Sequence, residues 1–183
     1  YPTRESLGRS FGWAADESAM GVYWTGVIRV LSPDAWVDED DPDKFREVFE
    51  SEGPIAHEFT HLVVDYLTKG NYTRWFTEGI AQYEEERLTG YQMEYRKIKH
   101  PGQLYPLSKM DNDFDNLKDQ GLAYYESLQA VNYIVDRYGE EGLQKVLKDL
   151  GSGYTLEKSF TRSLGMSMDQ FEKGFQIWAV ANS

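Results

Sequence analysis

The chain contains no cysteine and only three histidines among its 183 residues. Without cysteine it forms no disulfide bond, and cysteine usage therefore indicates no redox compartment. No apolar run reaches the length of about 20 residues that a transmembrane helix needs, so we expect no direct membrane insertion within this segment. Basic residues are also scarce, since 19 Lys and Arg stand against 31 Asp and Glu and give a net charge of −12. This balance disfavours nucleic acid and anionic membranes as partners.

The chain does contain enough apolar surface for one packed domain. Its hydrophobic fraction is 40% and its aromatic fraction is 15%, and a chain of this length can bury a sizeable core. We therefore expect a single domain over residues 1–183. It would consist of an N-terminal lobe over 1–75, which carries the motif described next, and a mainly helical lobe over 76–183.

Two of the three histidines frame a glutamate in an H-E-x-x-H pattern, with Glu58 between His57 and His61. On an α-helix, residues four apart project from one face, so the two imidazoles can converge on a single ion. A further carboxylate, that of Glu78, follows after 16 intervening residues. Two His and one Glu form a ligand set of catalytic zinc, which keeps a fourth position for water. The pattern therefore predicts a zinc site made by His57, His61 and Glu78.

Glu58 is adjacent to the first ligand, where it can take a proton from metal-bound water. Zinc lowers the pKa of such water to about 7 and polarises the carbonyl under attack. Glu58 would then pass its proton to the leaving amine. These roles predict a peptidase in which water attacks the peptide bond directly, with Glu58 as the general base and no covalent intermediate.

The residues around the motif predict a helix over 54–69. Pro54 is tolerated in a first turn, and Gly70 ends the helix. An apolar stripe recurs at spacings of four and three residues, at Ile55, Phe59, Leu62 and Tyr66. On a helical wheel this stripe lies opposite the two histidines, so we expect it to pack into a core.

A second helix is predicted over 76–88, around Glu78. Two small residues, Gly79 and Ala81, would let this helix approach the first one. The run of glutamates at 84–86 is typical of a solvated helix face, because consecutive charges of one sign are seldom buried.

At these residues the chain resembles a known family. The segments HEFTHLVVDY and WFTEGIAQY are similar to those of the gluzincin metallopeptidases, the thermolysin-like clan, and especially of small bacterial peptidase MA-like domains. The stretch from Leu122 to Trp178 is similar to the helical tail of those domains, with an Ala-Tyr start, an Arg-Tyr-Gly helix end and a later Leu-Gly-Met-Ser. The resemblance covers roughly residues 20–180.

The resemblance implies a zincin-like α+β fold, with a small strand-containing N-terminal lobe, a central H-E-x-x-H helix and a helical C-terminal lobe. It also implies a zinc peptidase acting on peptide or protein substrates, with His57, His61 and Glu78 as zinc ligands and Glu58 as catalytic base. Bacterial members of the family are often exported, so we expect an extracytoplasmic location, secreted or tethered through an upstream segment. Nothing in the sequence resembles the Gly-x-Met-Glu-Asn element with which related aminopeptidases hold a free amino terminus. Its absence favours an endopeptidase.

Peptide hydrolysis also requires a hydrogen-bond donor aimed at the oxygen that becomes negative. Thermolysin-like enzymes use a Tyr and a His of the second lobe for this. Tyr124 is the candidate here, because it matches the family's Ala-Tyr pair and begins an apolar helical stripe that ends at Tyr138. Tyr125 is the alternative, and both tyrosines could equally be core aromatics. The remaining histidine, His100, lies in a Lys-His-Pro turn and is expected to be an exposed loop residue.

A metal-ligating histidine usually donates its second N–H to a carboxylate or a carbonyl, which fixes the tautomer of the ring. Gln82 occupies a position where thermolysin carries an aspartate for this purpose. The partner in this chain must then be a backbone carbonyl, Asp65 or Gln82 itself.

The remaining elements follow from periodicity and from helix-breaking residues. Met20 to Leu31 is predicted as strand around Gly26, and Gly90 to Lys118 as irregular. A helix is expected over 43–50, after an Asp41 cap and Pro42. Further helices are expected over 120–138, 140–150, 155–164 and 168–181. A capping box of Ser167 and Gln170 opens the last of these. The segment Gly26–Ser32 would either form the edge strand of the cleft and pair with an extended substrate or be a buried sheet strand.

Two other functional classes stay open. The chain could be a zinc-holding binding or regulatory domain with a blocked or inactive cleft, although the intact Glu58 argues against this. It could also be a metal-free helical interaction domain. The alternating aspartates from Asp111 to Asp115 begin like an EF-hand loop, but Asn116 replaces its glycine and Leu122 stands in place of its glutamate, so that match fails.

Overall fold

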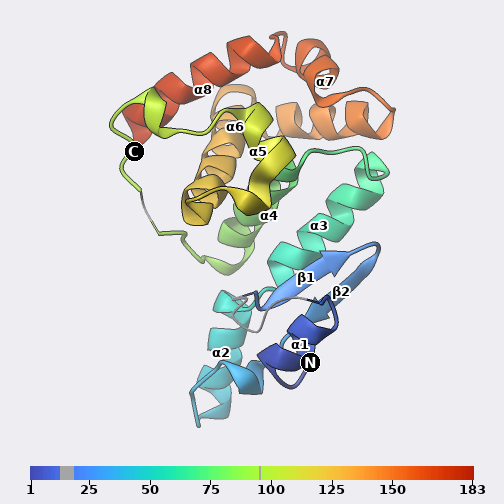
Figure 1. Ribbon diagram of the computed structural model, residues 1–183, viewed down its shortest axis with the longest axis vertical. Coiled ribbons are helices and arrows are strands. Elements are labelled where there is room, and N and C mark those ends of the chain that lie inside the picture. Colours follow the sequence, from blue (N-terminus) through green and yellow to red (C-terminus); the bar gives the residue numbers. More distant parts are fainter. Residues whose placement is uncertain (13–18, 95) are drawn as a thin grey trace. The chain divides into compact units, whose positions relative to one another are not determined.

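The structure is a computed structural model that describes residues 1–12, 19–94 and 96–183. The described residues are mostly helical, with a two-stranded antiparallel sheet near the N-terminus (Figure 1). In chain order the helices and strands are α1 (Arg4–Arg9), β1 (Gly21–Trp24), β2 (Val27–Val30), α2 (Pro42–Glu52), α3 (Ile55–Thr68), α4 (Arg74–Thr89), α5 (Leu107–Asp113), α6 (Gln120–Gly151), α7 (Leu156–Ser163) and α8 (Met168–Asn182). Helices together with a small separate sheet agree with the predicted α+β class.

The chain divides into two compact units. Unit 1 consists of Tyr1–Leu62 and Glu84–Gln92, and unit 2 consists of Val63–Tyr83 and Met93–Ser183. The division passes through α3 and α4, so each of these helices contributes residues to both units. The single domain over residues 1–183, with its lobes meeting at residue 75, stays a prediction.

In unit 1 the predicted strand region 20–31 forms a β-hairpin. β1 and β2 pair in an antiparallel register that begins with Gly21 opposite Val30. Thr25 and Gly26 form the turn, and both have positive φ angles, 46° and 84°. Two-residue hairpin turns of this kind match the twist of the strands but require such a backbone, which glycine adopts most easily. The single predicted strand is therefore two strands joined at the residue that the prediction singled out.

α2, also in unit 1, begins as the sequence predicted. The Asp41 side chain accepts hydrogen bonds from the backbone N–H groups of Asp43 and Lys44, at 2.9 and 3.2 Å. Pro42 occupies the first position, where its missing N–H costs no helical hydrogen bond. The helix continues to Glu52, two residues beyond the predicted end.

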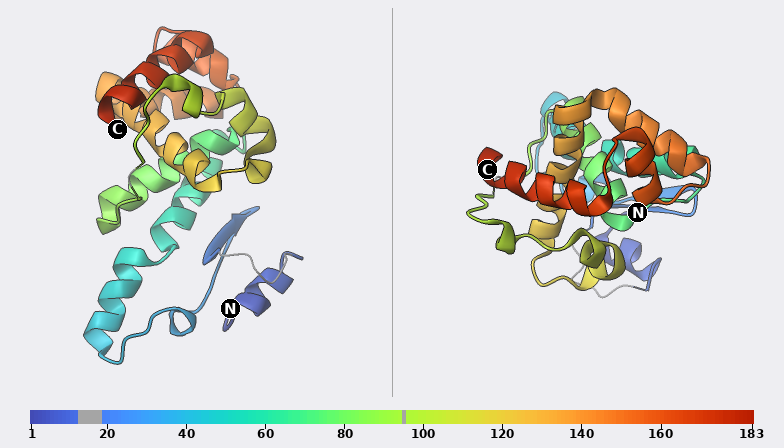
Figure 2. Two further views of the ribbon diagram at one scale, coloured as in Figure 1. Left: turned by 60° about the vertical axis from the view of Figure 1, so that its left-hand side comes forward. Right: turned by 90° about the horizontal axis from the view of Figure 1, so that it is seen from above.

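Unit 2 is built around α6, which packs against both α7 and α8 (Figures 1 and 2). Aromatic side chains fill its core, and those that are fully buried are Trp75, Phe76, Phe160, Phe171 and Phe175. Large aromatic surfaces contribute most to core stability when they meet edge to face or offset. Phe160 and Phe171, for example, meet edge to face with their ring centroids 4.7 Å apart.

The helical part of unit 2 largely follows the sequence prediction. Helices predicted over 120–138 and 140–150 form α6, which is interrupted at Gly139, where φ is 68° and ψ is 174°. Only glycine adopts this backbone readily. α8 begins with the predicted capping box, in which Ser167 and Gln170 exchange side chain to backbone hydrogen bonds.

The stretch 90–118, predicted to be irregular, contains α5, so the prediction is wrong there. Leu107 and Met110 lie one helical turn apart on α5, and both are buried in the core of unit 2. Pro106 stands directly before the helix, a position that proline tolerates. The proline that suggested a loop therefore starts a short amphipathic helix.

Unit 2 also buries a carboxyl group, that of Glu126 on α6. Glu126 is fully buried and accepts a hydrogen bond from the N–H of Tyr105 at 2.9 Å. Glu172 accepts one from the N–H of Leu107 at 3.2 Å. Burial raises the pKa of Glu126 from 4.5 to about 8, and the negative charge of Glu172 adds to the shift. Glu126 is therefore protonated at neutral pH, and the two glutamates hold the backbone on either side of Pro106.

We expect the free energy of unfolding to fall as the pH rises from 4.5 to about 8. Over this range the folded chain keeps a proton on Glu126 that the unfolded chain has released, so each step up in pH favours the unfolded chain. Glu126→Gln stays neutral and can still accept from Tyr105. Between pH ~5 and pH ~8.5 the variant should gain roughly 4 kcal/mol in free energy of unfolding relative to the wild type, measured by urea denaturation. A stability difference that is equal at the two pH values would contradict this account.

Candidate metal centre

The buried face of α3 is the one opposite its apolar stripe, whereas the sequence predicted that the stripe itself would be buried. Ile55, Phe59 and Tyr66 are exposed, Tyr66 to 82%, whereas Glu58 and His61 are each only 7% exposed. The prediction that the stripe packs into a core is therefore wrong. Periodicity identifies an apolar face, but other segments decide whether that face is covered. In this chain the enclosed face is the polar one, which carries the H-E-x-x-H pattern.

The three predicted ligands come together. One potential ligand atom from each of His57, His61 and Glu78 lies within 4.8 Å of the others, and the two imidazole centroids are 4.9 Å apart. Ligands about 2.1 Å from a tetrahedral zinc ion lie roughly 3.4 Å from one another. The group could hold a metal ion, and its two nitrogen donors and one carboxylate oxygen suit zinc.

Glu78 is buried on α4 and has a fixed partner in unit 2. Nη1 of Arg74, one turn earlier on the same helix, lies 2.9 Å from Oε1 of Glu78. The Arg74 guanidinium also lies over the Phe114 ring and 3.6 Å from a carboxylate oxygen of Asp115. Because a carboxylate has two oxygens, Arg74 can hold one of them while the other remains available to a metal. Arg74 was not among the predicted site residues, although its position four residues before Glu78 is a signal for an ion pair.

His57 has a carboxylate partner that was not among the predicted site residues. Its Nδ1 lies 3.2 Å from Oε2 of Glu85, whose side chain is only 15% exposed. The prediction that the glutamates at 84–86 form a solvated face is therefore wrong for Glu85. If Nδ1 donates its hydrogen to Glu85, Nε2 keeps the lone pair that binds a metal. The signal was present, because Glu85 follows Glu78 by two helical turns and so lies on the same face of α4.

Replacing Glu85 by alanine is expected to lower zinc affinity by about 10- to 100-fold, the usual cost of removing the partner that orients a ligating histidine. The measurement is a competition titration against a coloured zinc chelator. Glu84→Ala is the matched control, since Glu84 pairs with Arg87 on the same helix. Equal affinity of the Glu85 variant and the control would show that this carboxylate does not orient His57.

Gly79 and Gln82 link α4 to α6 within unit 2. A Cβ atom on Gly79 would lie 2.2 Å from the Ser127 carbonyl oxygen. Gly79 therefore permits a close approach to α6, whereas the sequence predicted a close approach to the H-E-x-x-H helix. Gln82 donates to the carbonyl oxygens of Glu78 and Tyr124, at 3.2 and 2.9 Å. Gln82 therefore joins two helices, and the partner of His57 is a carboxylate three residues further along.

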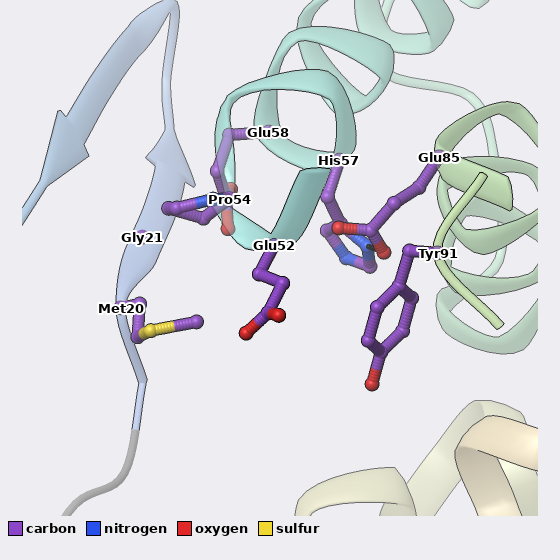
Figure 3. A pocket seen from close by; sticks show the side chains of 8 residues that line it. All are labelled: Met20, Gly21, Glu52, Pro54, His57, Glu58, Glu85 and Tyr91. Carbon is purple, nitrogen blue, oxygen red and sulfur yellow. Dashed lines mark hydrogen bonds and ion pairs between the residues drawn. The ribbon is translucent and has the colours of Figure 1, made fainter. Parts of the chain in front are cut away.

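A cavity of about 360 Å³ lies in unit 1, beside the H-E-x-x-H pattern (Figure 3). Its lining comes from the start of the hairpin, the end of α2, the first turn of α3 and the end of α4 with the residues that follow. The lining residues are Met20, Gly21, Glu52, Pro54, His57, Glu58, Glu85 and Tyr91. The predicted general base, Glu58, thus faces a space that could receive part of a substrate.

The strand beside Glu58 is β1. A Cβ atom on Gly21 would lie 2.8 Å from Cγ of Glu58 and 2.8 Å from Cβ of Pro54, so only glycine lets the strand approach α3 this closely. The outer edge of β2 is already paired, because Tyr1 accepts from the N–H of Ser32 and donates to the carbonyl of Val30. β1 is therefore the strand that lies against Glu58. The substrate-pairing edge at Gly26–Ser32 and its alternative, a buried sheet strand, both stay predictions.

The two candidate tyrosines differ in their surroundings within unit 2. Tyr124 is half-buried and meets Phe114 edge to face at 5.1 Å. Tyr125 is buried in the core, with 4% of its surface exposed. His100 is exposed at the start of a short 3₁₀ turn, as predicted. The role of Tyr124 or Tyr125 as an oxyanion donor stays a prediction.

Comparison with known proteins identifies the class to which the chain belongs. A family model described as the Peptidase MA superfamily matches residues 46–181. The chain therefore belongs to the Peptidase MA superfamily and forms a peptidase-like domain. The resemblance seen in the sequence is confirmed at this level.

The chain is also similar to the uncharacterized protein YhcO of Bacillus subtilis (strain 168), with 22% identity over 137 residues. The alignment covers 70% of this chain and 41% of YhcO, so the chain spans less than half the length of that relative. No solved structure matches the chain. Among the described residues, no helix is both long and apolar enough to cross a membrane.

Proposed function

We propose that the protein is a zinc-dependent peptidase of the gluzincin type, with a zincin-like fold, and that it cleaves peptides or proteins as an endopeptidase. One observation carries the proposal. Ligand atoms of His57, His61 and Glu78 lie within 4.8 Å of one another, with Glu58 between the two histidines, in a chain of the Peptidase MA superfamily. An extracytoplasmic location is part of the same proposal.

In this proposal His57, His61 and Glu78 would hold the zinc ion, which supplies Lewis-acid activation of water and of the scissile carbonyl. Glu58 takes a proton from the attacking water and gives it to the leaving amine. Its position supports this role, because Glu58 is adjacent to His57 and lines the cavity that could receive part of a substrate. No side chain forms a covalent bond with the substrate.

Other residues position these groups. Glu85 orients the His57 ring through Nδ1, and Arg74 fixes one oxygen of Glu78. Tyr124 donates a hydrogen bond to the oxygen that becomes negative in the tetrahedral intermediate. Its partial exposure supports this choice over the buried Tyr125, whose hydroxyl is less accessible to a substrate.

The outer edge of β1 would bind the substrate backbone. Leu31 donates its N–H to the Met20 carbonyl at 2.8 Å, so the next residue of β1, Gly21, directs its N–H and C=O away from β2. An extended peptide can add to such an edge as a further strand. Because Gly21 lies against Glu58, a peptide bound there would pass the catalytic carboxylate, as an endopeptidase requires.

The test is cleavage of a broad peptide library by the zinc-loaded protein, with and without a strong chelator. We expect cleavage that disappears on chelation and returns when zinc is added. Internal cuts in peptides with blocked ends would support an endopeptidase. Zinc binding without cleavage of any library member would overturn the proposal in favour of a zinc-holding binding domain, and cleavage that chelation leaves intact would overturn the role of the metal.

A further inference from the structure

The cavity beside Glu58 is strongly acidic. Three of its eight lining residues are glutamates, Glu52, Glu58 and Glu85, and the described lining includes no lysine or arginine. Two of these carboxylates already have a proposed role, since Glu58 is the proposed base and Glu85 is hydrogen-bonded to His57. Glu52, the last residue of α2, is exposed and makes no hydrogen bond or ion pair with a basic side chain among the described residues. One charge in the cavity is therefore available to a ligand.

The rest of the lining suits a long side chain with an apolar stem. In Figure 3 the Glu52 side chain lies between those of Met20 and Tyr91. Pro54 adds a further apolar surface. Lysine and arginine side chains place their methylene groups along surfaces of this kind and carry the charge at the tip.

Tyr91 provides a second indication of the negative potential in the cavity. Burial raises the pKa of the Tyr91 hydroxyl, and the negative charges of Glu85, Glu52 and Glu86 raise it further. The carboxylates therefore act together on a group that lines the cavity, and they would attract a cation at the same place.

We infer that this cavity binds a positively charged group of the substrate next to the bond that is cleaved, with Glu52 as the residue that selects it. The group is the ammonium or guanidinium of a lysine or arginine side chain; the α-ammonium of a substrate N-terminus has the same chemistry. The inference rests on the proposed function, because it names the substrate class of the same site. Selection would come from pairing the charge with Glu52 and from leaving a neutral or acidic side chain without that pair.

The first experiment compares internally quenched peptides that differ only in one residue flanking the cleaved bond. Zinc-loaded protein should cleave the Lys and Arg peptides with a kcat/KM about fivefold above that of the Gln peptide, the upper end expected for an ion pair in contact with water, and the Glu peptide more slowly still. Each peptide is used with a free and with an acetylated N-terminus. A preference that survives acetylation assigns the cation to the side chain, and one that acetylation removes assigns it to the α-ammonium. Equal rates for Lys, Gln and Glu peptides would overturn the inference.

The second experiment changes the selecting residue. Glu52→Gln should lower the Lys to Gln ratio of kcat/KM towards one, and Glu52→Lys should shift the preference towards the Glu peptide. Glu50→Gln, an exposed glutamate on the same helix that does not line the cavity, is the matched control and should keep the wild-type ratio. An unchanged ratio in both Glu52 variants would overturn the inference.

A binding measurement separates this inference from the proposed function. Calorimetry on zinc-loaded Glu58→Gln should show tighter binding of the Lys peptide than of the Gln peptide, and the difference should disappear when Glu52→Gln is added. If the wild type cleaves peptides but shows no preference in rate or binding, only the inference fails. If it cleaves no peptide, the proposed function fails and the inference with it.

Discussion

Glu58→Gln is expected to lower kcat/KM for a peptide substrate by about a thousandfold, within the range found for removing a general acid–base group. The amide has nearly the size and shape of the carboxylate, which matters because Glu58 is 7% exposed and lies against Gly21. The glutamine amide, however, cannot accept a proton from water at neutral pH. The fold should therefore remain intact while the proton transfer is lost.

The same variant should keep its zinc, because Glu58 is not one of the three residues whose ligand atoms come together. Cleavage rates and zinc content are measured on the same preparations, with Glu50→Gln on the exposed side of α2 as control. Loss of activity together with loss of zinc would mean that Glu58 acts as a ligand. Full activity in the variant would remove Glu58 from the mechanism.

The site shows which features a sequence can define. A spacing of four residues on one helix places both histidine rings on the same face, so the pairing of His57 and His61 follows from local geometry. Glu78 was selected by its spacing from His61, and the resemblance of its surrounding segment to a known family supported the choice. The start of α2 at Asp41 and the break at Gly139 were also predictable, since they depend on side-chain capping and on a backbone that glycine favours.

What could not be predicted depends on packing between segments distant in the sequence. The apolar stripe of α3 is exposed and its polar face enclosed, because coverage is decided by neighbours that a periodic pattern does not identify. Glu85 belongs to a run of three glutamates, and only its contact with His57 distinguishes it from the other two. Likewise, β1 rather than Gly26–Ser32 lies beside Glu58, because Gly21 lacks the side chain that would separate them.

Glu78→Ala should have the second large effect, the loss of tight zinc binding. Even the removal of a group that merely orients a ligand lowers metal affinity by about 10- to 100-fold, so removal of a ligand should lower it by more than about a hundredfold. The fold should tolerate the change, since Arg74, the ion-pair partner of Glu78, is 44% exposed and also lies near Asp115. Glu84→Ala, on the same helix, is the control for loss of a glutamate outside the site.

The most direct measurement is the zinc content per chain after equilibration with zinc and removal of the unbound metal, by elemental analysis of the wild type, Glu78→Ala and Glu84→Ala. A site made by His57, His61 and Glu78 predicts one zinc per chain in the wild type and in Glu84→Ala, and close to none in Glu78→Ala. Wild-type protein without stoichiometric zinc, or a Glu78→Ala variant that retains it, would contradict the metal centre on which the proposed peptidase depends.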